Sequence, residues 1–338
     1  MKHFSTACLV ASLGLVLSPM VQAQTSVKMV LDWAFEGPQS TWTAAAESGC
    51  FKQQGLDLSM DRGMGSGDAI AKVASGAYNI GVADFGNVVR YNDANPNNKL
   101  TMVFVLYDAS PLGVVLLKKS GVKTPKDLEG MRLSGPQGES ARVMFPAFAK
   151  KTGIDASKVN WVTVTPDLRQ ATVVKGLADG AAGHMNTVIK GMAALKVPAE
   201  EMTIMSYSEH GLDVPGNVVI VKPEWASANK AAVKGVLTCA VAGVKKALDD
   251  PKAAVATLKK FNSMVDEANE LNNLNFALKS LLVTPGVTKN GFSHIDAARY
   301  DEALGAVAEA LSVRKPALSE VWSADYLPAA GVLSLKSR

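Results

Sequence analysis

The sequence predicts an α/β protein built from two lobes that are joined by a hinge of two chain crossings. Short apolar runs alternate with helical patterns along most of the chain, which is typical of βα units around a mostly parallel sheet. This series restarts once, after the apolar run at residues 101–107, and a block of helical patterns follows it at the C-terminal end. Two series of βα units indicate two lobes, each with its own sheet.

The first series begins with an apolar run at residues 27–32, which predicts a strand. An alanine-rich stretch at residues 40–51 predicts the helix that follows it. The same reasoning predicts further elements in the order strand 56–60, helix 67–75, strand 79–83, helix 85–92 and strand 101–107. Together these elements would make the sheet and helices of one lobe.

The second series repeats the pattern from residue 113 onward. Thr124 can cap a short helix, Pro125 fits its first position, and Gly130 can end it in the left-handed conformation. Around this helix we expect strands at 113–117, 131–134, 159–164 and from 180 to 182, and helices at 139–152 and 167–178. These elements would make the second lobe.

The chain should cross between the lobes twice, near residues 107–111 and near residues 207–216. A last strand and four helical stretches then follow, at 218–221, 230–248, 253–261, 267–282 and 297–311. We therefore assign residues 24–110 and 213–338 to lobe one and residues 111–212 to lobe two. The two crossings would form the hinge between them.

The first 23 residues have the features of a secretory signal peptide. Lys2 precedes a short apolar run at residues 7–16, and the segment ends in Val-Gln-Ala at Ala23. A positive start, an apolar core and a small-x-small end are typical of a cleaved signal, and the run is too short to span a bilayer. We expect cleavage after Ala23 and a protein located in the periplasm.

Composition argues against several classes of function. The formal net charge of +4 is small for 338 residues and the basic residues are scattered, so we expect no nucleic-acid partner. There is no CxxC, HExxH or His/Cys cluster, so we expect neither a metal site nor a cofactor. An oxidising compartment permits Cys50 and Cys239 to pair, but the sequence leaves open whether they do, because pairing depends on geometry.

Several segments in a fixed order resemble a known family. They are Leu31-Asp32-Trp33, Glu47 to Phe51, Gln54 to Leu58, Ala74 to Val82, Lys123 to Gly130 and Pro215 to Val218. In this order and spacing they are similar to the NMT1/THI5-like and alkanesulfonate-type periplasmic binding proteins. The resemblance implies the two-lobed, type II periplasmic-binding-protein fold, a small-molecule ligand in the cleft and an ABC permease as membrane partner. We expect a monomer.

The chain departs from this family in two places. Many relatives carry a Trp-Glu-Pro-like turn after a strand of the second lobe, where this chain has Ala-Gly-His-Met-Asn at residues 182–186. Relatives that make a thiamine pyrimidine carry a cysteine-rich segment, which this chain lacks. The first departure removes a ligand contact of the family, and the second argues against synthesis of a pyrimidine precursor.

Two glycine-rich turns that join a strand to a helix are candidate ligand contacts, one at residues 63–68 in lobe one and one at 134–140 in lobe two. Glycines let the backbone approach a ligand, and a helix start offers free N–H groups. Ligand crevices of such sheets lie at the carboxyl ends of the strands. An ordinary tight turn is the alternative interpretation. The contacts expected from these turns are Ser66, Gly67, Gln137, Gly138 and Ser140.

The other candidate contacts are mostly side chains that follow a strand or open a helix. Trp33 can stack on a flat ligand, whereas Trp42 is expected in the core. Asp84 is expected to cap a helix, and it can also accept a hydrogen bond from the ligand. His184 has either a structural role or a contact with the ligand. The full set outside the turns is Trp33, Phe35, Gln39, Asp84, Phe85, Tyr107, His184 and Asn186.

The charges expected around the cleft bear on the ligand. Asp68, Asp84 and Glu139 each stand at or beside a predicted helix start, and three acids would repel an anion. Arg62 and Arg142 lie near two of the turns and could compensate. If these two point away, a flat, donor-rich heterocycle fits better than a sulfonate.

We therefore predict a periplasmic substrate-binding protein of an ABC importer that captures an aromatic or heterocyclic solute, such as a thiamine pyrimidine precursor. An alkanesulfonate or an aromatic carboxylate is the alternative ligand. A pyrimidine-precursor synthesis enzyme and a receptor-coupled sensor are the alternative classes. Against an enzyme, the exported chain would hold only the histidines His184, His210 and His294, and it has no GxSxG motif.

Overall fold

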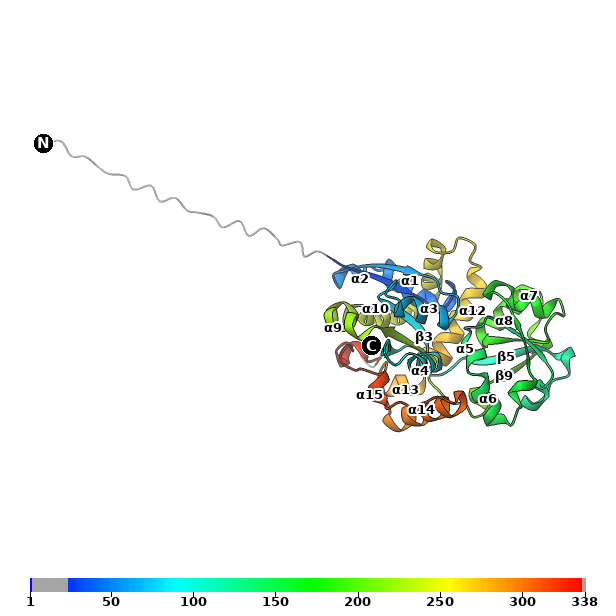
Figure 1. Cartoon of the computed structure of the whole chain (residues 1–338). Helices are drawn as coiled ribbons and strands as arrows, with labels where there is room; N and C mark the ends of the chain where they lie inside the picture. Colours follow the sequence, from blue (N-terminus) through cyan, green and yellow to red (C-terminus); the bar gives the residue numbers. More distant parts are fainter. Residues whose placement is uncertain (2–23, 336–338) are drawn as a thin grey trace.

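Two five-stranded sheets with helices around them form the two lobes of the protein. The computed structural model describes residue 1 and residues 24–335, so the predicted signal peptide, apart from Met1, lies outside the described residues. Figure 1 shows the lobes side by side, and the C-terminal helices, in yellow to red, belong to the lobe that holds the N-terminal strands. The predicted α/β fold of two lobes is confirmed.

The first sheet combines four early strands with one strand that returns from the second lobe. Its order is β2 (Leu56–Asp61), β1 (Thr25–Val30), β3 (Ile80–Asp84), β10 (Asn217–Val221) and β4 (Thr101–Val105). Strand β1 runs parallel to β2 and β3, whereas β10 runs antiparallel to β3 and β4. The returning strand therefore lies inside the sheet and ties the C-terminal helical block to it.

The second sheet is built in the same way. Its order is β7 (Asn160–Thr163), β6 (Arg132–Gly135), β8 (Gly180–His184), β5 (Leu112–Leu117) and β9 (Met202–Ser206). Strand β5, the first after the crossing, runs antiparallel to β8 and β9. Each sheet is thus mixed rather than mostly parallel, because the first strand after each crossing inserts between strands of opposite direction. Strand β9 has no counterpart among the predicted strands.

The two crossings run beside each other. The chain passes from β4 to β5 through residues 106–111, and it returns from β9 to β10 through residues 207–216. Gly216 N–H donates to the carbonyl of Tyr107 at 2.9 Å, and a Cβ at Gly216 would come within 2.9 Å of the Tyr107 Cβ. The absence of a side chain at residue 216 is what lets the two segments pair. The lobe boundaries given above remain a prediction.

The helices surround the sheets. Those of the first lobe are η1 (Gly37–Gln39), α1 (Ser40–Glu47), α2 (Cys50–Gln53), α3 (Ser66–Ala74), α4 (Phe85–Ala94), α9 (Pro223–Ala228), α10 (Lys230–Asp249), α11 (Pro251–Ala256), η8 (Thr257–Lys260), α12 (Glu267–Ala277), η9 (Leu278–Leu282), α13 (Pro285–Asn290), α14 (Ala297–Leu311), α15 (Leu318–Val321) and α16 (Ala330–Leu333). Those of the second lobe are η2 (Lys118–Ser120), η3 (Pro125–Leu128), α5 (Ser140–Val143), α6 (Phe145–Thr152), η4 (Ala156–Lys158), η5 (Pro166–Leu168), α7 (Arg169–Val174), α8 (Met185–Ala194) and η6 (Ala199–Glu201), with η7 (Ser208–His210) in the returning segment. Within residues 24–335, no helix has the length and apolar character needed to cross a membrane.

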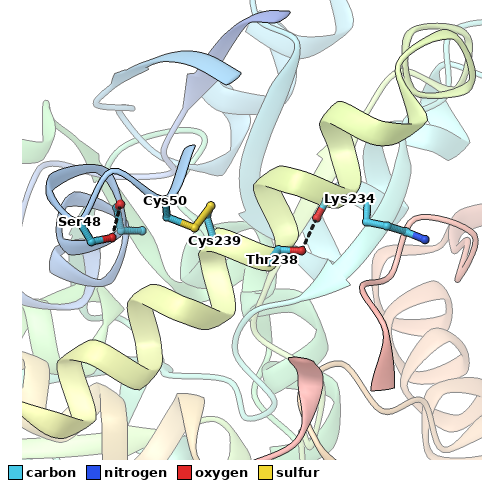
Figure 2. The surroundings of a disulfide bond; sticks show 6 residues. Ser48, Cys50, Lys234, Thr238 and Cys239 are labelled. Carbon is cyan, nitrogen blue, oxygen red and sulfur yellow. Dashed lines mark hydrogen bonds between the residues drawn. A yellow bond between two sulfur atoms is a disulfide. The ribbon is translucent and has the colours of Figure 1, made fainter. Parts of the chain in front are cut away.

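The predicted helix at residues 40–51 breaks in two at Gly49, which adopts a left-handed conformation with φ of 73°. Helix α1 packs closely on α10: a Cβ at Gly243 would lie 1.9 Å from the carbonyl oxygen of Thr41. A disulfide between Cys50 and Cys239 joins α2 to α10, with the two Cα atoms 5.7 Å apart (Figure 2). The cysteines, whose pairing the sequence left open, therefore bridge two segments of the first lobe that lie 189 residues apart.

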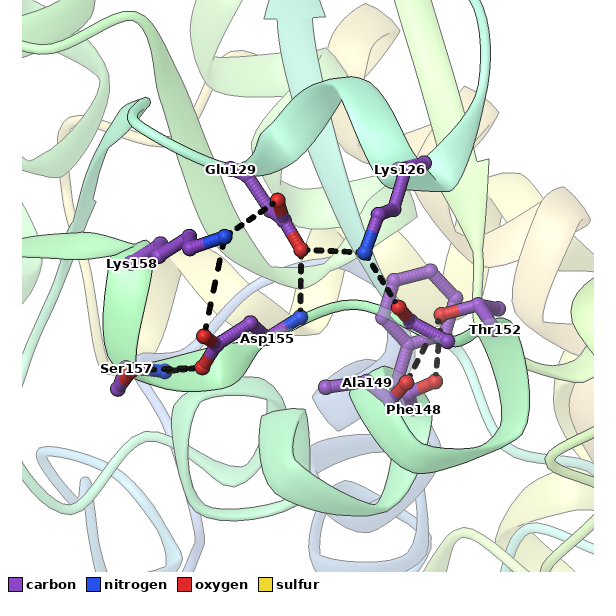
Figure 3. Close-up of polar contacts among 9 residues, drawn as sticks. Lys126, Glu129, Phe148, Ala149, Thr152, Asp155, Ser157 and Lys158 are labelled. Carbon is purple, nitrogen blue, oxygen red and sulfur yellow. Dashed lines mark hydrogen bonds and ion pairs between the residues drawn. The ribbon is translucent and has the colours of Figure 1, made fainter.

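The short helix of the second lobe begins and ends with the predicted residues. Pro125 begins η3, Thr124 stands at its N-cap, and Gly130 follows in a left-handed conformation with φ of 83°. The carboxylate of Glu129 accepts hydrogen bonds from Lys126 Nζ at 2.6 Å and from the backbone N–H of Asp155 at 2.7 Å (Figure 3). These contacts hold the turn against the loop that precedes β7.

Candidate ligand-binding cleft

A small cavity lies between the two lobes. Its volume is about 20 Å³, which is room for about one water molecule. Its lining residues are Asp32, Trp33, Pro38, Gln39, Gly65, Ser66 and Tyr107 from the first lobe and Glu139, Ser140, Arg169, His184, Asn186 and Thr187 from the second. Because both lobes contribute to its lining, this cavity marks the cleft between them.

The two glycine-rich turns face each other across this cleft, as their positions in the two sheets predict. Ser66 Oγ and Ser140 Oγ are hydrogen-bonded at 3.0 Å. Gly67 N–H donates to the carbonyl of Gly138 at 3.3 Å, and a Cβ at Gly67 would lie 3.1 Å from the Gly138 Cα. The glycines therefore let the two backbones touch when the lobes are closed, and neither Gly67 nor Gly138 lines the cavity.

A second set of contacts closes the other side of the cleft. Lys190 Nζ of α8 lies 3.0 Å from the carboxylate of Glu36 and 2.7 Å from that of Glu270. Thr187 Oγ1 also donates to Glu36, at 3.2 Å. Burial lowers the pKa of Lys190, but the two carboxylates outweigh it and hold this pKa above its usual value. Helix α8 is thus attached to the first lobe by charge-assisted bonds.

Arg169 is the cation of the cavity. Its side chain is only 1% exposed, and Nη1 pairs with the buried carboxylate of Glu139 at 3.0 Å. The guanidinium also lies over the ring of Trp33, 4.8 Å from the ring centroid, which is a cation–π distance. Nε and Nη2 have no hydrogen-bond partner among the described residues. Burial raises the pKa of Glu139, although Arg169 opposes this.

Asp32 is the acid of the first lobe that reaches the cavity. It lies just beyond the end of β1, and one of its carboxylate oxygens accepts from Asn217 Nδ2 at 2.8 Å. The side chain of Gln39 also hydrogen-bonds to it. Burial raises the pKa of Asp32 to about 6, although these hydrogen bonds oppose the shift. Asp32 is therefore mostly ionised at neutral pH and close to the point of protonation.

His184 ends β8 and faces the ring of Tyr107, with 6.3 Å between the ring centroids. Burial, aided by the charge of Arg169, lowers the pKa of His184 to about 3. The imidazole is therefore neutral near pH 7. It can exchange hydrogen bonds with a ligand, but it is a poor proton acceptor at that pH.

Seven of the thirteen predicted contacts line the cavity: Trp33, Gln39, Ser66, Tyr107, Ser140, His184 and Asn186. The others lie elsewhere. Phe35 packs on Phe261, with 4.6 Å between ring centroids, and Phe85 meets Tyr300 edge-on at 6.1 Å. Gln137 is exposed, and Gly67 and Gly138 form the contact between the turns described above.

Asp84 caps α4, which is its simpler predicted role. Its Oδ1 accepts from the backbone N–H of Gly86 at 3.0 Å, and its Oδ2 has no partner in the described part of the chain. The residue is fully buried behind Ser66, whose Oγ accepts from the Asp84 N–H at 2.9 Å. Asp84 does not line the cavity, whereas Asp32 of the same lobe does.

Sequence reasoning missed Arg169, and the two arginines that it named as possible compensating cations do not line the cavity. Arg142 bonds to Thr163 and lies over Trp161, and Arg62 makes an exposed ion pair with Asp167. Arg169 begins a helix and carries no motif, so nothing in its local sequence marks it as a cavity residue. Trp42, in contrast, lies in the core as expected, with 2% of its surface exposed. Within residues 24–335, no group of three or more His, Cys, Asp or Glu side chains is placed to hold a metal.

Comparison with known proteins decides the family. A family model described as NMT1/THI5 like matches residues 40–254. The chain belongs to the NMT1/THI5-like family. A relative from Legionella pneumophila, named 4-amino-5-hydroxymethyl-2-methylpyrimidine phosphate synthase, is 22% identical to this NMT1/THI5-like chain over 240 residues, which cover 71% of the chain and 74% of the relative.

Solved structures identify the fold of this NMT1/THI5-like chain. The alkanesulfonate-binding protein SsuA from Xanthomonas axonopodis pv. citri, bound to MOPS, matches with a TM-score of 0.70 at 14% identity over 90% of this chain and 99% of its own. The periplasmic nitrate-binding protein NrtA from Synechocystis PCC 6803 matches with a TM-score of 0.66 at 10% identity over 90% and 87%. At these identities the likeness shows the fold, which is that of periplasmic binding proteins.

Proposed function

We propose that this NMT1/THI5-like protein is the substrate-binding protein of an ABC importer, which captures one small organic solute between its lobes and delivers it to a membrane permease. The main support is the cavity between the lobes, because three of its lining residues carry buried polar atoms without a partner in the described chain: Arg169 Nε and Nη2, Gln39 Oε1 and Asn186 Oδ1. Buried polar groups are nearly always hydrogen-bonded. A ligand that completes these bonds is the simplest account of them.

The arrangement of the chain supports capture by closure. Residues 24–110 and 213–338 would move as one body and residues 111–212 as the other, about the paired segments that join β4 to β5 and β9 to β10. The contacts between the two turns and between Lys190 and its two carboxylates join the lobes, so they would stabilise the closed, loaded protein. Fold neighbours that are named as binding proteins of import systems support delivery to a permease.

Binding without chemistry fits the site better than catalysis. His184 is the imidazole of the cavity, and with a pKa of about 3 it is a poor base at neutral pH. The serines that meet across the cleft are hydrogen-bonded to each other rather than to a base. The synthase name of one relative keeps a pyrimidine-processing enzyme as the alternative class.

Export to the periplasm is part of the proposal. The disulfide between Cys50 and Cys239 supports it, because structural disulfides are rare in the reducing cytosol. The signal-like segment at residues 1–23 supports it independently. N-terminal sequencing of the protein from the periplasmic fraction should begin at Gln24. A full-length chain recovered from the membrane fraction would contradict export.

The ligand predicted from sequence was an aromatic or heterocyclic solute, with a sulfonate or aromatic carboxylate as the alternative. Trp33 and Tyr107 are both in the cavity wall and would suit a flat ligand. One face of Trp33 is covered by Arg169, however, and Asp84 lies off the cavity. The buried guanidinium shifts the preference toward a ligand that carries an acidic group.

The test is identification of the bound solute followed by titration. Native mass spectrometry of protein from the periplasm should show one small molecule per chain. Added back at about 100 times its dissociation constant, that molecule should stabilise the protein by about 2.7 kcal/mol, and X-ray scattering should show a smaller radius. As a control pair at the two ends of α3, Ser66→Phe should fill the cavity and abolish binding, whereas Ser75→Phe, at the exposed C-cap, should not.

Binding protein and enzyme predict different products. Incubation of the purified protein with the identified solute should return the solute unchanged, and deletion of the gene should abolish its uptake by cells. The proposal would be wrong if the purified protein retained no small molecule and bound none in a broad metabolite screen. An unchanged radius in X-ray scattering throughout that screen would support the same conclusion.

A further inference from the structure

One edge of the Arg169 guanidinium has no hydrogen-bond partner among the described residues. Nη1 is committed to Glu139 at 3.0 Å and to the carbonyl of Ala182 at 3.4 Å. The two nitrogens without a partner, Nε and Nη2, lie on the same edge of the planar guanidinium and point their N–H bonds in parallel. Such an edge matches the two oxygens of a carboxylate, which binds it through two parallel hydrogen bonds. Glu139 makes no hydrogen bond to this edge, since its bond to the guanidinium is at Nη1.

A chain of hydrogen bonds orients the amide of Asn186, which lines the cavity. The backbone N–H of Gly37 donates to Glu270 Oε2 at 2.7 Å, so that oxygen is an acceptor. Asn273 Nδ2 therefore donates to the same oxygen, at 3.3 Å, which leaves Asn273 Oδ1 to accept. The bond between Asn273 Oδ1 and Asn186 must then use the Asn186 NH₂ group. As a result Asn186 Oδ1, buried and unpartnered among the described residues, needs a donor.

Gln39 presents a second acceptor from the opposite lobe. Its side chain hydrogen-bonds to the carboxylate of Asp32, and an ionised carboxylate can only accept, so the Gln39 NH₂ group is used there. Gln39 Oε1 is buried and has no partner in the described part of the chain. Each lobe thus contributes one buried amide oxygen that lacks a hydrogen-bond donor among the described residues.

The charges of the wall favour a cationic group as that donor. Arg169 contributes one positive charge and Glu139 one negative charge, and Asp32 adds a second negative charge near neutral pH. A ligand that brings only a carboxylate would increase this excess of negative charge. An ammonium group on the same ligand offsets it and supplies up to three donors for Asp32, Gln39 and Asn186.

We propose that the solute is a small amino carboxylate, whose carboxylate binds the Nε/Nη2 edge of Arg169 and whose ammonium group donates to Asn186, Gln39 and Asp32. This inference rests on the proposed function, since it names the ligand class of the same cleft. It also assigns Asn273, which lies outside the cavity wall, as a positioning residue: it holds the Asn186 amide so that its oxygen faces the ligand.

Matched compounds test the ligand class by calorimetry on the exported protein freed of bound solute. The probes are glycine, β-alanine, 4-aminobutanoate, 5-aminopentanoate and 4-aminobenzoate. Each is compared with the same acid without the amine, the same amine without the acid, and the corresponding aminosulfonate. At least one amino carboxylate should bind ten-fold or more tightly than all three of its partners. If a compound without a carboxylate or without an amine binds best, the inference is wrong while the proposed function stands. A solute found by mass spectrometry that is not an amino carboxylate would likewise show that the inference is wrong and leave the proposed function standing.

Two variants test the roles of the residues. Arg169→Lys keeps the charge but loses the planar edge, and it should weaken binding of the best amino carboxylate ten-fold or more. Asn273→Ala should weaken binding of the amino carboxylate several-fold and leave binding of the acid without the amine nearly unchanged. The ratio of the two affinities should therefore decrease. Asn275→Ala, on the exposed face of the same helix α12, is the control and should change neither. Equal losses for both ligands in Asn273→Ala would show that Asn273 only helps to close the lobes, and would overturn its assignment. This variant decides its point even if Arg169→Lys fails to fold.

Discussion

The two lobes contain the same strand-to-helix junction, used in two ways. Strand β3 leads into α4 through Asp84, and β8 leads into α8 through His184, with nearly the same backbone angles: φ and ψ are −69° and 141° at Asp84 and −65° and 118° at His184. Asp84 caps its own helix and is buried away from the cavity. His184 makes no side-chain cap and lines the cavity.

The difference lies in the side chain and not in the fold. A short carboxylate at an N-cap accepts hydrogen bonds from the free N–H groups of its own helix. The Asp84 side chain therefore bonds to α4. An imidazole at the same place extends beyond the helix start. The lobes also differ in how they are held together. The first carries a disulfide and an extended helical block, whereas the second depends on the buried pair of Arg169 and Glu139.

Removal of Arg169 should have the largest effect on stability. Arg169→Met leaves the carboxylate of Glu139 buried without its cation, and breaking such a pair typically costs about 3–5 kcal/mol. Urea denaturation should report this loss as a lower midpoint. The double variant Arg169→Met/Glu139→Leu should recover much of it, since no unpaired charge remains. Arg132→Met, which removes an exposed arginine of the same lobe, is the control and should change stability much less. Equal losses in the two single variants would mean that the second lobe does not depend on the buried pair.

Removal of the disulfide should weaken the first lobe. Because the bridge closes a loop of 189 residues, the variant Cys50→Ala/Cys239→Ala should lose about 2–5 kcal/mol. Hydrogen exchange should become faster in α1, α2 and α10, while the core strands of the second lobe keep their native-state protection. Reducing agent should have a similar effect on the wild type and none on the double variant. If the second lobe loosened equally, the lobes would not be separate units of stability.

Neutralisation of Asp84 should stabilise the protein. Burial raises the pKa of Asp84 to about 7 from its ordinary 3.8, so the unfolded chain loses this proton at lower pH than the folded one. Stability contributed by the protonated form is therefore lost as pH rises from about 4 to about 7. Asp84→Asn keeps a good N-cap and should gain on the order of 2 kcal/mol at pH 8 and almost nothing at pH 4. Ligand affinity should stay the same, because Asp84 does not line the cavity. Weaker ligand binding by this variant would show that Asp84 contributes to ligand binding after all.

Exchange of the residue type at the other junction should have the smallest effect on stability and a clear one on binding. His184→Asn gives α8 the side-chain cap that it lacks, worth about 1 kcal/mol. The same change removes a ring from the cavity wall, so affinity for the solute should fall. Thermal unfolding without ligand and calorimetry with it separate the two effects. A variant that binds as tightly as the wild type would show that His184 contributes only shape.

Much of the fold follows from local patterns. The alternation of apolar runs and helical spacings predicts two series of βα units, and the caps at Thr124 and Gly130 lie where their chemistry requires. Strand β9 was missed although it is buried at both ends. Its five residues, Met-Thr-Ile-Met-Ser, are too short and too mixed to stand out from a loop. The direction of β5 and β10 could not be read either, because it depends on which strands each one meets after a crossing.

The cavity divides in the same way. The sequence by itself determined its location, since the turns and strand ends that carry Trp33, Ser66, Ser140 and His184 mark the carboxyl edges of two sheets. Only the tertiary structure decided its chemistry. The ion pair of Arg169 with Glu139 joins residues 30 positions apart along the chain, and the disulfide spans 189. Whether a charge is buried, paired or left with a free edge depends on such distant neighbours, and no local pattern of residues encodes them.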